Sequence, residues 1–122
     1  MIRTRIIGTG SYLPERVVSN REVGASLGIE PAVVSRLTGI QERRRAAASQ
    51  ASSDLAVEAA RPALEAAGLP VSEVGAIVLS TTSPDTVFPS TACHVQRMLG
   101  CSTIPAFDVA ASCSGFLYGL SM

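Results

Sequence analysis

The chain has 122 residues, of which 47% are apolar and only 16% charged, so it is richer in apolar residues than an average soluble domain. Its ten basic residues, all Arg, balance ten acidic ones, which leaves no electrostatic case for binding nucleic acid or an anionic membrane. No segment reaches the roughly 20 apolar residues that span a bilayer, and the N-terminus lacks the apolar run of a signal peptide. We therefore expect a cytoplasmic protein of one domain or part of one, with much of its apolar surface covered.

The three cysteines are odd in number and widely spaced. Cys93, Cys101 and Cys113 are separated by eight and twelve positions, and no C-x-x-C pair occurs. Zinc sites usually contain such closely spaced pairs, so we expect no metal site. In a reducing compartment these thiols should also remain free.

Short elements are predicted in the first 45 residues. A strand over residues 3–9 is followed by a helix over 21–27, for which the preceding Ser-Asn pair offers an N-cap. A second helix starts at Pro31 and runs toward Leu37, because proline suits the first helical position and a glycine follows. Residues 41–45 (QERRR) read as a charged surface stretch.

The clearest helix covers residues 54–67, with Ser52 or Ser53 as its cap and apolar residues at helical spacing. Pro62 lies inside it, so a kink or break is expected there. The almost continuous apolar run at residues 74–81 (VGAIVLST) suits a strand buried on both faces of a parallel sheet.

Strands and helices continue to alternate in the last third of the chain. A helix is predicted over residues 90–99, a short buried strand over 105–109, and a helix from 110 to the end. This alternation predicts an α/β layered sheet with helices on its faces. The chain ends inside an apolar helical pattern without a C-cap, so we expect it to be cut short of a complete domain.

The stretch FDVAASCSGF, residues 107–116, carries the chemistry. A strand leads through small residues to Cys113 near the start of a helix, which is the arrangement of a nucleophile elbow. Backbone N–H groups at a helix N-terminus favour a thiolate, and a turn N–H can help to hold an oxyanion. A thioester on sulfur remains open to attack by a carbon nucleophile. From these residues alone, a small buried cysteine remains the commoner explanation.

Four blocks in order along the chain change this assessment. They are IIGTGSYLPERVVSN, TGIQERR, IVLSTTSPDTVFPSTACHVQRMLG and FDVAASCSGFLYGLSM. Together they resemble the β-ketoacyl-acyl-carrier-protein synthase III family over nearly the whole chain, with TGIQERR similar to that family's T-G-I-x-x-R-R/H stretch. The resemblance makes Cys113 the expected nucleophile.

The resemblance implies a thiolase-like layered αβαβα fold, of which this chain covers most of the first half, usually as a homodimer. It implies that an acyl group passes from coenzyme A to Cys113 and condenses with malonyl-acyl-carrier protein, with loss of carbon dioxide, to start a fatty acid or polyketide. Coenzyme A is then a thioester substrate, and no cofactor is expected. The family's catalytic His and Asn lie far downstream of the cysteine and outside these 122 residues.

Three further residues are candidates for a functional or an interface role. Phe88 matches a position at which the family sends a Phe across the dimer interface into an acyl pocket, although it can equally be an ordinary core or interface aromatic. His94, the only histidine, is interpreted as a helix-surface or interface residue. The family holds the coenzyme A adenine with a Trp and an Arg just ahead of T-G-I. This chain has no Trp and has Leu37 there, with Arg36 one place earlier as a substitute.

These departures keep two alternatives open. One is a polyketide-pathway acyltransferase or an enzyme that condenses two acyl thioesters, and the other is a non-catalytic fragment that lacks the downstream His and Asn. The run Arg43, Arg44 and Arg45 can bind a phosphate or an acidic carrier protein, but a run of charges is more often solvated surface.

Overall fold

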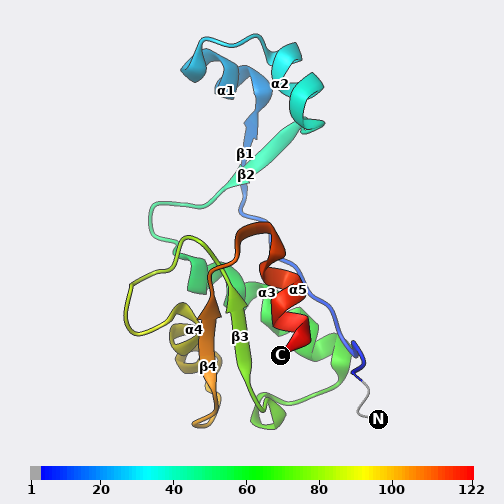
Figure 1. Cartoon of the computed structure of the whole chain (residues 1–122), viewed down its shortest axis with the longest axis vertical. Helices are drawn as coiled ribbons and strands as arrows, with labels where there is room; N and C mark the ends of the chain where they lie inside the picture. Colours follow the sequence, from blue (N-terminus) through cyan, green and yellow to red (C-terminus); the bar gives the residue numbers. More distant parts are fainter. Residues whose placement is uncertain (1–3) are drawn as a thin grey trace. The chain divides into compact units, whose positions relative to one another are not determined.

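The computed structural model describes residues 4–122, and the chain forms two compact units (Figure 1). One unit, here the hairpin unit, is Leu13–Ser49. The other, here the sheet unit, consists of Met1–Tyr12 and Gln50–Met122, and it contains the segment around Cys113.

The hairpin unit places two helices between two paired strands. β1 (Arg16–Ser19) leads into α1 (Asn20–Leu27) and α2 (Pro31–Thr38), and β2 (Glu42–Arg45) returns antiparallel to β1. Both predicted helices are confirmed, including proline at the start of α2 and a glycine with positive φ after each helix. The expected surface stretch, residues 41–45, is largely exposed, and its residues 42–45 form strand β2, which the charged sequence did not predict.

A single buried side chain links the elements of the hairpin unit. Asn20 is 6% exposed, and its Nδ2 donates to Ser35 Oγ and to the carbonyl oxygen of Ile40, both at 2.7 Å. Its Oδ1 accepts from the Arg43 guanidinium, also at 2.7 Å. Asn20 therefore connects the start of α1 with α2, with the loop that follows α2, and with β2.

The sheet unit contains a parallel pair of strands with helices packed on them (Figure 1). α3 (Ser52–Ala67) precedes β3 (Ile77–Ser80), α4 (Thr91–Leu99) connects β3 to β4 (Ala106–Val109), and α5 (Gly115–Ser121) follows. A 3-10 turn at Val71–Glu73 and a second at Ser112–Ser114 complete the unit. The register pairs Ile77 with Ala106 and Ser80 with Val109. The α/β class and the parallel pairing are thus confirmed.

The predicted strand at residues 3–9 is wrong for its described part, residues 4–9, and Arg3 lies outside the described residues. This segment is irregular because it passes close to α3 instead of joining a sheet. A Cβ on Gly8 would lie 2.3 Å from the Ala63 carbonyl oxygen, and one on Gly10 equally close to the Ala59 carbonyl oxygen. Only glycine permits this approach.

The helix predicted over residues 54–67 starts earlier than expected and does not break. α3 begins at Ser52 with Ala51 as its N-cap, and the Ala51 N–H donates to Asp54 Oδ2 at 2.8 Å. The helix continues through Pro62 to Ala67, so the expected break is absent. Pro62 has no N–H to donate, but the helical conformation is continuous on both sides of it.

Burial is lower than the composition predicts. Among the described residues the buried apolar side chains are Val18, Val57, Ala92 and Val95. β3, expected to be buried on both faces, has three half-buried residues and one exposed residue. Large apolar side chains on α5 are open, with Phe116 67% and Leu117 66% exposed. Within residues 4–122, no helix is long and apolar enough to cross a membrane.

Candidate active site

Cys113 lies in the passage from β4 to α5. The strand ends at Val109, Ser112 has a positive φ of 46°, and Cys113 is the middle residue of the 3-10 turn Ser112–Ser114. The Ser114 N–H donates to the Ala111 carbonyl oxygen at 3.0 Å, which closes the turn. The strand–turn–helix geometry expected from FDVAASCSGF is therefore present, although the helix starts at Gly115 and not at residue 110.

The Cys113 side chain is exposed, whereas Cys93 and Cys101 are half-buried. In this structure Cys113 is available to a reagent or substrate. Positive φ is uncommon outside glycine, so Ser112 marks the sharp bend that turns the chain just before the cysteine.

Close packing explains the small residues after the cysteine. Gly115 is buried, and a Cβ there would lie 1.8 Å from Ser80 Oγ on β3. One turn later, a Cβ on Gly119 would meet Val78 Cγ1 at 3.6 Å. Gly115 therefore lets α5 lie directly against β3, whereas a Cβ on Gly119 would make only an ordinary van der Waals contact. Beside them is a hollow of about 260 Å³, lined by Val78, Ser80, Gly115, Phe116, Gly119 and Leu120.

The strand that leads to Cys113 is anchored by Asp108. Its two carboxylate oxygens accept hydrogen bonds from the backbone N–H groups of Thr91, at 2.7 Å, and Ala92, at 2.8 Å. These two N–H groups lie in the first turn of α4 and have no acceptor within the helix. The N-cap residue, Ser90, makes no side-chain cap bond to them. A carboxylate in this position is stabilised by the charge-assisted bonds and by the helix dipole.

A second carboxylate anchors the loop between β3 and α4. Asp85 accepts from the Ser53 N–H at 2.9 Å and from the Ser53 hydroxyl, in the first turn of α3. The Asp85 N–H donates at 3.1 Å to Thr91 Oγ1, and Thr91 is fully buried. The starts of α3 and α4 are thus connected through Asp85 and Thr91, and from there through Asp108 to β4.

The sequence did not point to these two aspartates. A signal was present for Asp108, because it is a charged residue between Phe107 and Val109 in an otherwise apolar strand. A buried carboxylate requires partners, and helix N-termini supply them. Asp85 follows Ser83-Pro84 in a loop and carried no such signal.

Phe88 lies in the same loop and is 89% exposed, and the neighbouring Val87 is 99% exposed. Within residues 4–122 no side chain covers this tip. His94 is half-buried on α4, and its Nε2 lies 3.1 Å from Thr86 Oγ1. This position agrees with a structural or interface role for His94.

Arg36 lies in the last turn of α2 and is exposed. It belongs to the hairpin unit, whereas Cys113 and Phe88 belong to the sheet unit. Over residues 4–122, no group of three or more His, Cys, Asp and Glu side chains is arranged to hold a metal ion. The catalytic role predicted for Cys113 and the substrate-binding roles predicted for Phe88 and Arg36 remain predictions.

Comparison with known proteins gives a consistent result, although no family model matches the sequence. The chain is 51% identical over 120 residues to acetoacetyl CoA synthase NphT7 of Streptomyces sp. (strain CL190), covering 98% of this chain and 36% of the relative. It is 52% identical over 119 residues to β-ketoacyl-[acyl-carrier-protein] synthase III of Hyphomonas neptunium, covering 98% of this chain and 37% of that enzyme.

Two solved structures share the fold. The 3-oxoacyl-[acyl-carrier-protein] synthase III of Aquifex aeolicus VF5 matches with a TM-score of 0.92 and 41% identity, over 98% of this chain and 38% of that one. The priming β-ketosynthase of the R1128 polyketide biosynthetic pathway matches with a TM-score of 0.91 and 35% identity, over 96% of this chain and 35% of that one.

The fold and the turn that carries Cys113 match part of the thiolase-like α/β fold of these solved structures. More narrowly, in sequence and in structure the chain is similar to β-ketoacyl-acyl-carrier-protein synthase III, and it spans little more than a third of the length of these relatives. The resemblance drawn from the four sequence blocks is thereby confirmed.

Proposed function

We propose that this chain supplies the acyl-accepting cysteine of a condensing enzyme. The Cys113 thiolate attacks the carbonyl carbon of an acyl-coenzyme A thioester, the bond from that carbon to the coenzyme A sulfur breaks, and the departing thiolate takes up a proton. The single observation that carries the proposal is the exposed Cys113 on the tight turn between β4 and α5.

The second step proposed is condensation. Malonyl-acyl-carrier protein loses carbon dioxide, and the carbanion left behind attacks the acyl carbonyl on Cys113. The cysteine leaves as a thiolate, and the product is a β-ketoacyl thioester on the carrier protein. The name of the relative in Hyphomonas neptunium supports this acceptor. The step needs the His and Asn implied by the resemblance, so we assign turnover to an enzyme that includes them, as a homodimer in the cytosol and without a resident cofactor.

Intact-mass spectrometry of the protein after incubation with acetyl-coenzyme A tests the first step. A mass increase of one acetyl group, mapped to the peptide that contains Cys113, is expected. Cys113→Ala should abolish the adduct, whereas Cys101→Ala, a matched removal of one thiol, should retain it. An acetyl group that persists in Cys113→Ala, or no adduct on the native chain, would contradict the proposal. The absence of an adduct on the native chain would favour the alternative of a non-catalytic fragment.

A second candidate is condensation of two coenzyme A thioesters. It is supported by the 51% identity to a protein named acetoacetyl CoA synthase and by Leu37 ahead of Thr38-Gly39-Ile40 in a chain without Trp. Offering malonyl-coenzyme A and malonyl-acyl-carrier protein in parallel to an enzyme that contains this chain separates the two. Acetoacetyl-coenzyme A as the main product would replace the first candidate by the second.

A further inference from the structure

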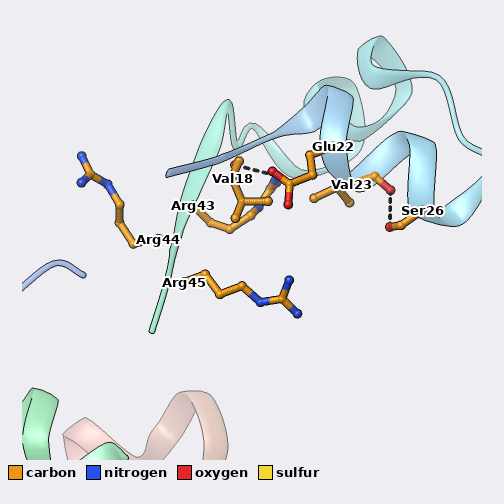
Figure 2. Close-up of a pocket in the computed structure, with 7 residues that line it drawn as sticks. All are labelled: Val18, Glu22, Val23, Ser26, Arg43, Arg44 and Arg45. Carbon is orange, nitrogen blue, oxygen red and sulfur yellow. Dashed lines mark hydrogen bonds between the residues drawn. The ribbon is translucent and has the colours of Figure 1, made fainter. Parts of the chain in front are cut away.

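A hollow of about 450 Å³ lies in the hairpin unit between α1 and β2 (Figure 2). It is lined by Val18, Glu22, Val23, Ser26, Arg43, Arg44 and Arg45, and we call it the arginine hollow. All of these residues lie within one unit, so the hollow does not depend on how the two units are placed.

Strand geometry determines which arginines share a face. Side chains alternate along a strand, so Arg43 and Arg45 project from the same face of β2 and Arg44 from the other. Figure 2 shows Arg44 extending away from Arg45, and the Arg44 guanidinium donates to the Pro14 carbonyl oxygen at 3.2 Å. Across the hairpin, Arg45 is paired directly with Arg16 of β1. The face therefore carries three guanidinium groups, those of Arg16, Arg43 and Arg45.

Two of these three guanidinium groups have partners within the hairpin unit. Arg16 forms an ion pair with Glu22 of α1. Arg43 donates to Asn20 Oδ1 at 2.7 Å and to the Val18 carbonyl oxygen at 3.4 Å, so it is held in the framework. The Arg45 guanidinium has no hydrogen-bond or ion-pair partner among the described residues. Three positive charges against the single carboxylate of Glu22 leave an excess of two on this face.

This arrangement has an energetic cost that a ligand would remove. Like charges placed directly opposite on paired strands are destabilising, and here Arg16 faces Arg45 while the only carboxylate is bound to Arg16. A planar guanidinium with free donors matches a phosphoryl group, which can accept two parallel hydrogen bonds. Ser26, whose hydroxyl donates to the Val23 carbonyl oxygen at 2.8 Å, also lines the hollow, and Val18 and Val23 form its apolar wall.

We propose that the arginine hollow binds a phosphoryl group, with Arg45 as the main contact. The wall formed by Val18 and Val23 then contacts the uncharged part of a phosphorylated ligand. Such a group can come from the nucleotide part of a coenzyme A thioester or from a free phosphate compound. The proposal is independent of the chemistry at Cys113, which lies in the other unit.

Calorimetric titration of the protein with inorganic pyrophosphate at low ionic strength tests the proposal. Saturable binding is expected, and Arg45→Gln should weaken it about tenfold, since a charge-assisted bidentate contact is lost. Arg21→Gln on α1 removes the same charge from a residue that does not line the hollow, and it should leave the affinity within about twofold. Arg45→Gln should remain folded, because it also removes the like-charge pair with Arg16.

The outcomes separate the alternatives. Equal weakening by Arg45→Gln and Arg21→Gln, or no saturable binding of pyrophosphate, would overturn the site and leave solvated surface charge as the explanation. If coenzyme A competes with pyrophosphate in the native protein and loses affinity in Arg45→Gln, the phosphoryl group comes from the nucleotide. If pyrophosphate binds and coenzyme A does not compete, a free phosphate compound is the ligand. An acyl-enzyme test that fails while pyrophosphate binds would reject the proposed function alone.

Discussion

Gly115 and Ser80 approach so closely that a Cβ on the glycine would lie 1.8 Å from the serine Oγ. This contact holds the first residue of α5 against the last residue of β3, two positions after Cys113. Because glycine has no side chain, residue 115 lets α5 begin close to β3, directly after the turn that contains Cys113.

Gly115→Ala should consequently destabilise the sheet unit. Overpacking of this kind costs about 1–3 kcal/mol, because the Ser80 hydroxyl must rotate away and Ser80 Cβ, 3.0 Å from the added methyl group, must also move slightly. Urea unfolding followed by circular dichroism measures the change. Gly75→Ala is the matched control, since a Cβ there meets no atom within 4 Å. Equal unfolding midpoints for the two variants would show that α5 moves without cost.

The helix cap provided by Asp108 leads to a second expectation. Asp108→Asn keeps one acceptor oxygen but loses the charge, so the bonds to Thr91 and Ala92 weaken, and we expect a loss of about 1–2 kcal/mol. Glu58→Gln, an exposed carboxylate change on α3, should have almost no effect. Hydrogen exchange should rise first at the start of α4. Unchanged exchange there would mean that the cap contributes little.

Exposure of the three thiols sets their order of alkylation. Cys113 is open, whereas the Cys93 thiol accepts from Ser90 Oγ at 3.2 Å and contacts the Ala106 carbonyl oxygen at 3.7 Å. Brief treatment with iodoacetamide should therefore label Cys113 before Cys93, since accessibility limits the reaction. Peptide mapping at a series of times measures the order, and Cys113→Ala identifies the fast site. Faster labelling of Cys93 would mean that the β4–α5 turn is covered in solution.

Removal of the Asn20 side chain should loosen the hairpin unit as a whole. Asn20→Ala deletes three hydrogen bonds and leaves the Arg43 guanidinium without its side-chain acceptor, at a cost of about 2–3 kcal/mol. Ser35→Ala, which removes only one of these partners, should cost about 1 kcal/mol. Hydrogen exchange across β1 and β2 reports the difference. Similar values for the two variants would show that the bonds of Asn20 to Arg43 and Ile40 contribute little.

The features that could be predicted from the sequence are those that depend on interactions between neighbouring residues. The helices at 21–27 and 31–37 could be predicted because a capping side chain or a proline marks the start, and each is followed by a glycine. The helix at 90–99 could be predicted because Gly100 marks its end. The turn at Cys113 was found because small residues between a strand and a helix indicate a sharp bend. These features depend on a few neighbouring residues.

Features that depend on distant partners were missed. β2 consists of Glu42 and three arginines, and it is a strand only because β1 lies beside it. Residues 4–9 have the composition of a strand but have no strand partner within the described chain, and they lie along α3 instead. The links from Asp85 to Ser53 and from Asp108 to Thr91 span 32 and 17 positions, and no local pattern announces them.

Within residues 4–122, β3 and β4 hydrogen-bond only to each other, so each strand has one outer edge with backbone donors and acceptors free. A polypeptide that adds a strand on the β4 edge would run beside the strand that leads to Cys113. The environment of the thiol can thus be changed by strand addition at this edge. Peptides designed as edge strands become a way to block or to build that environment without altering the cysteine.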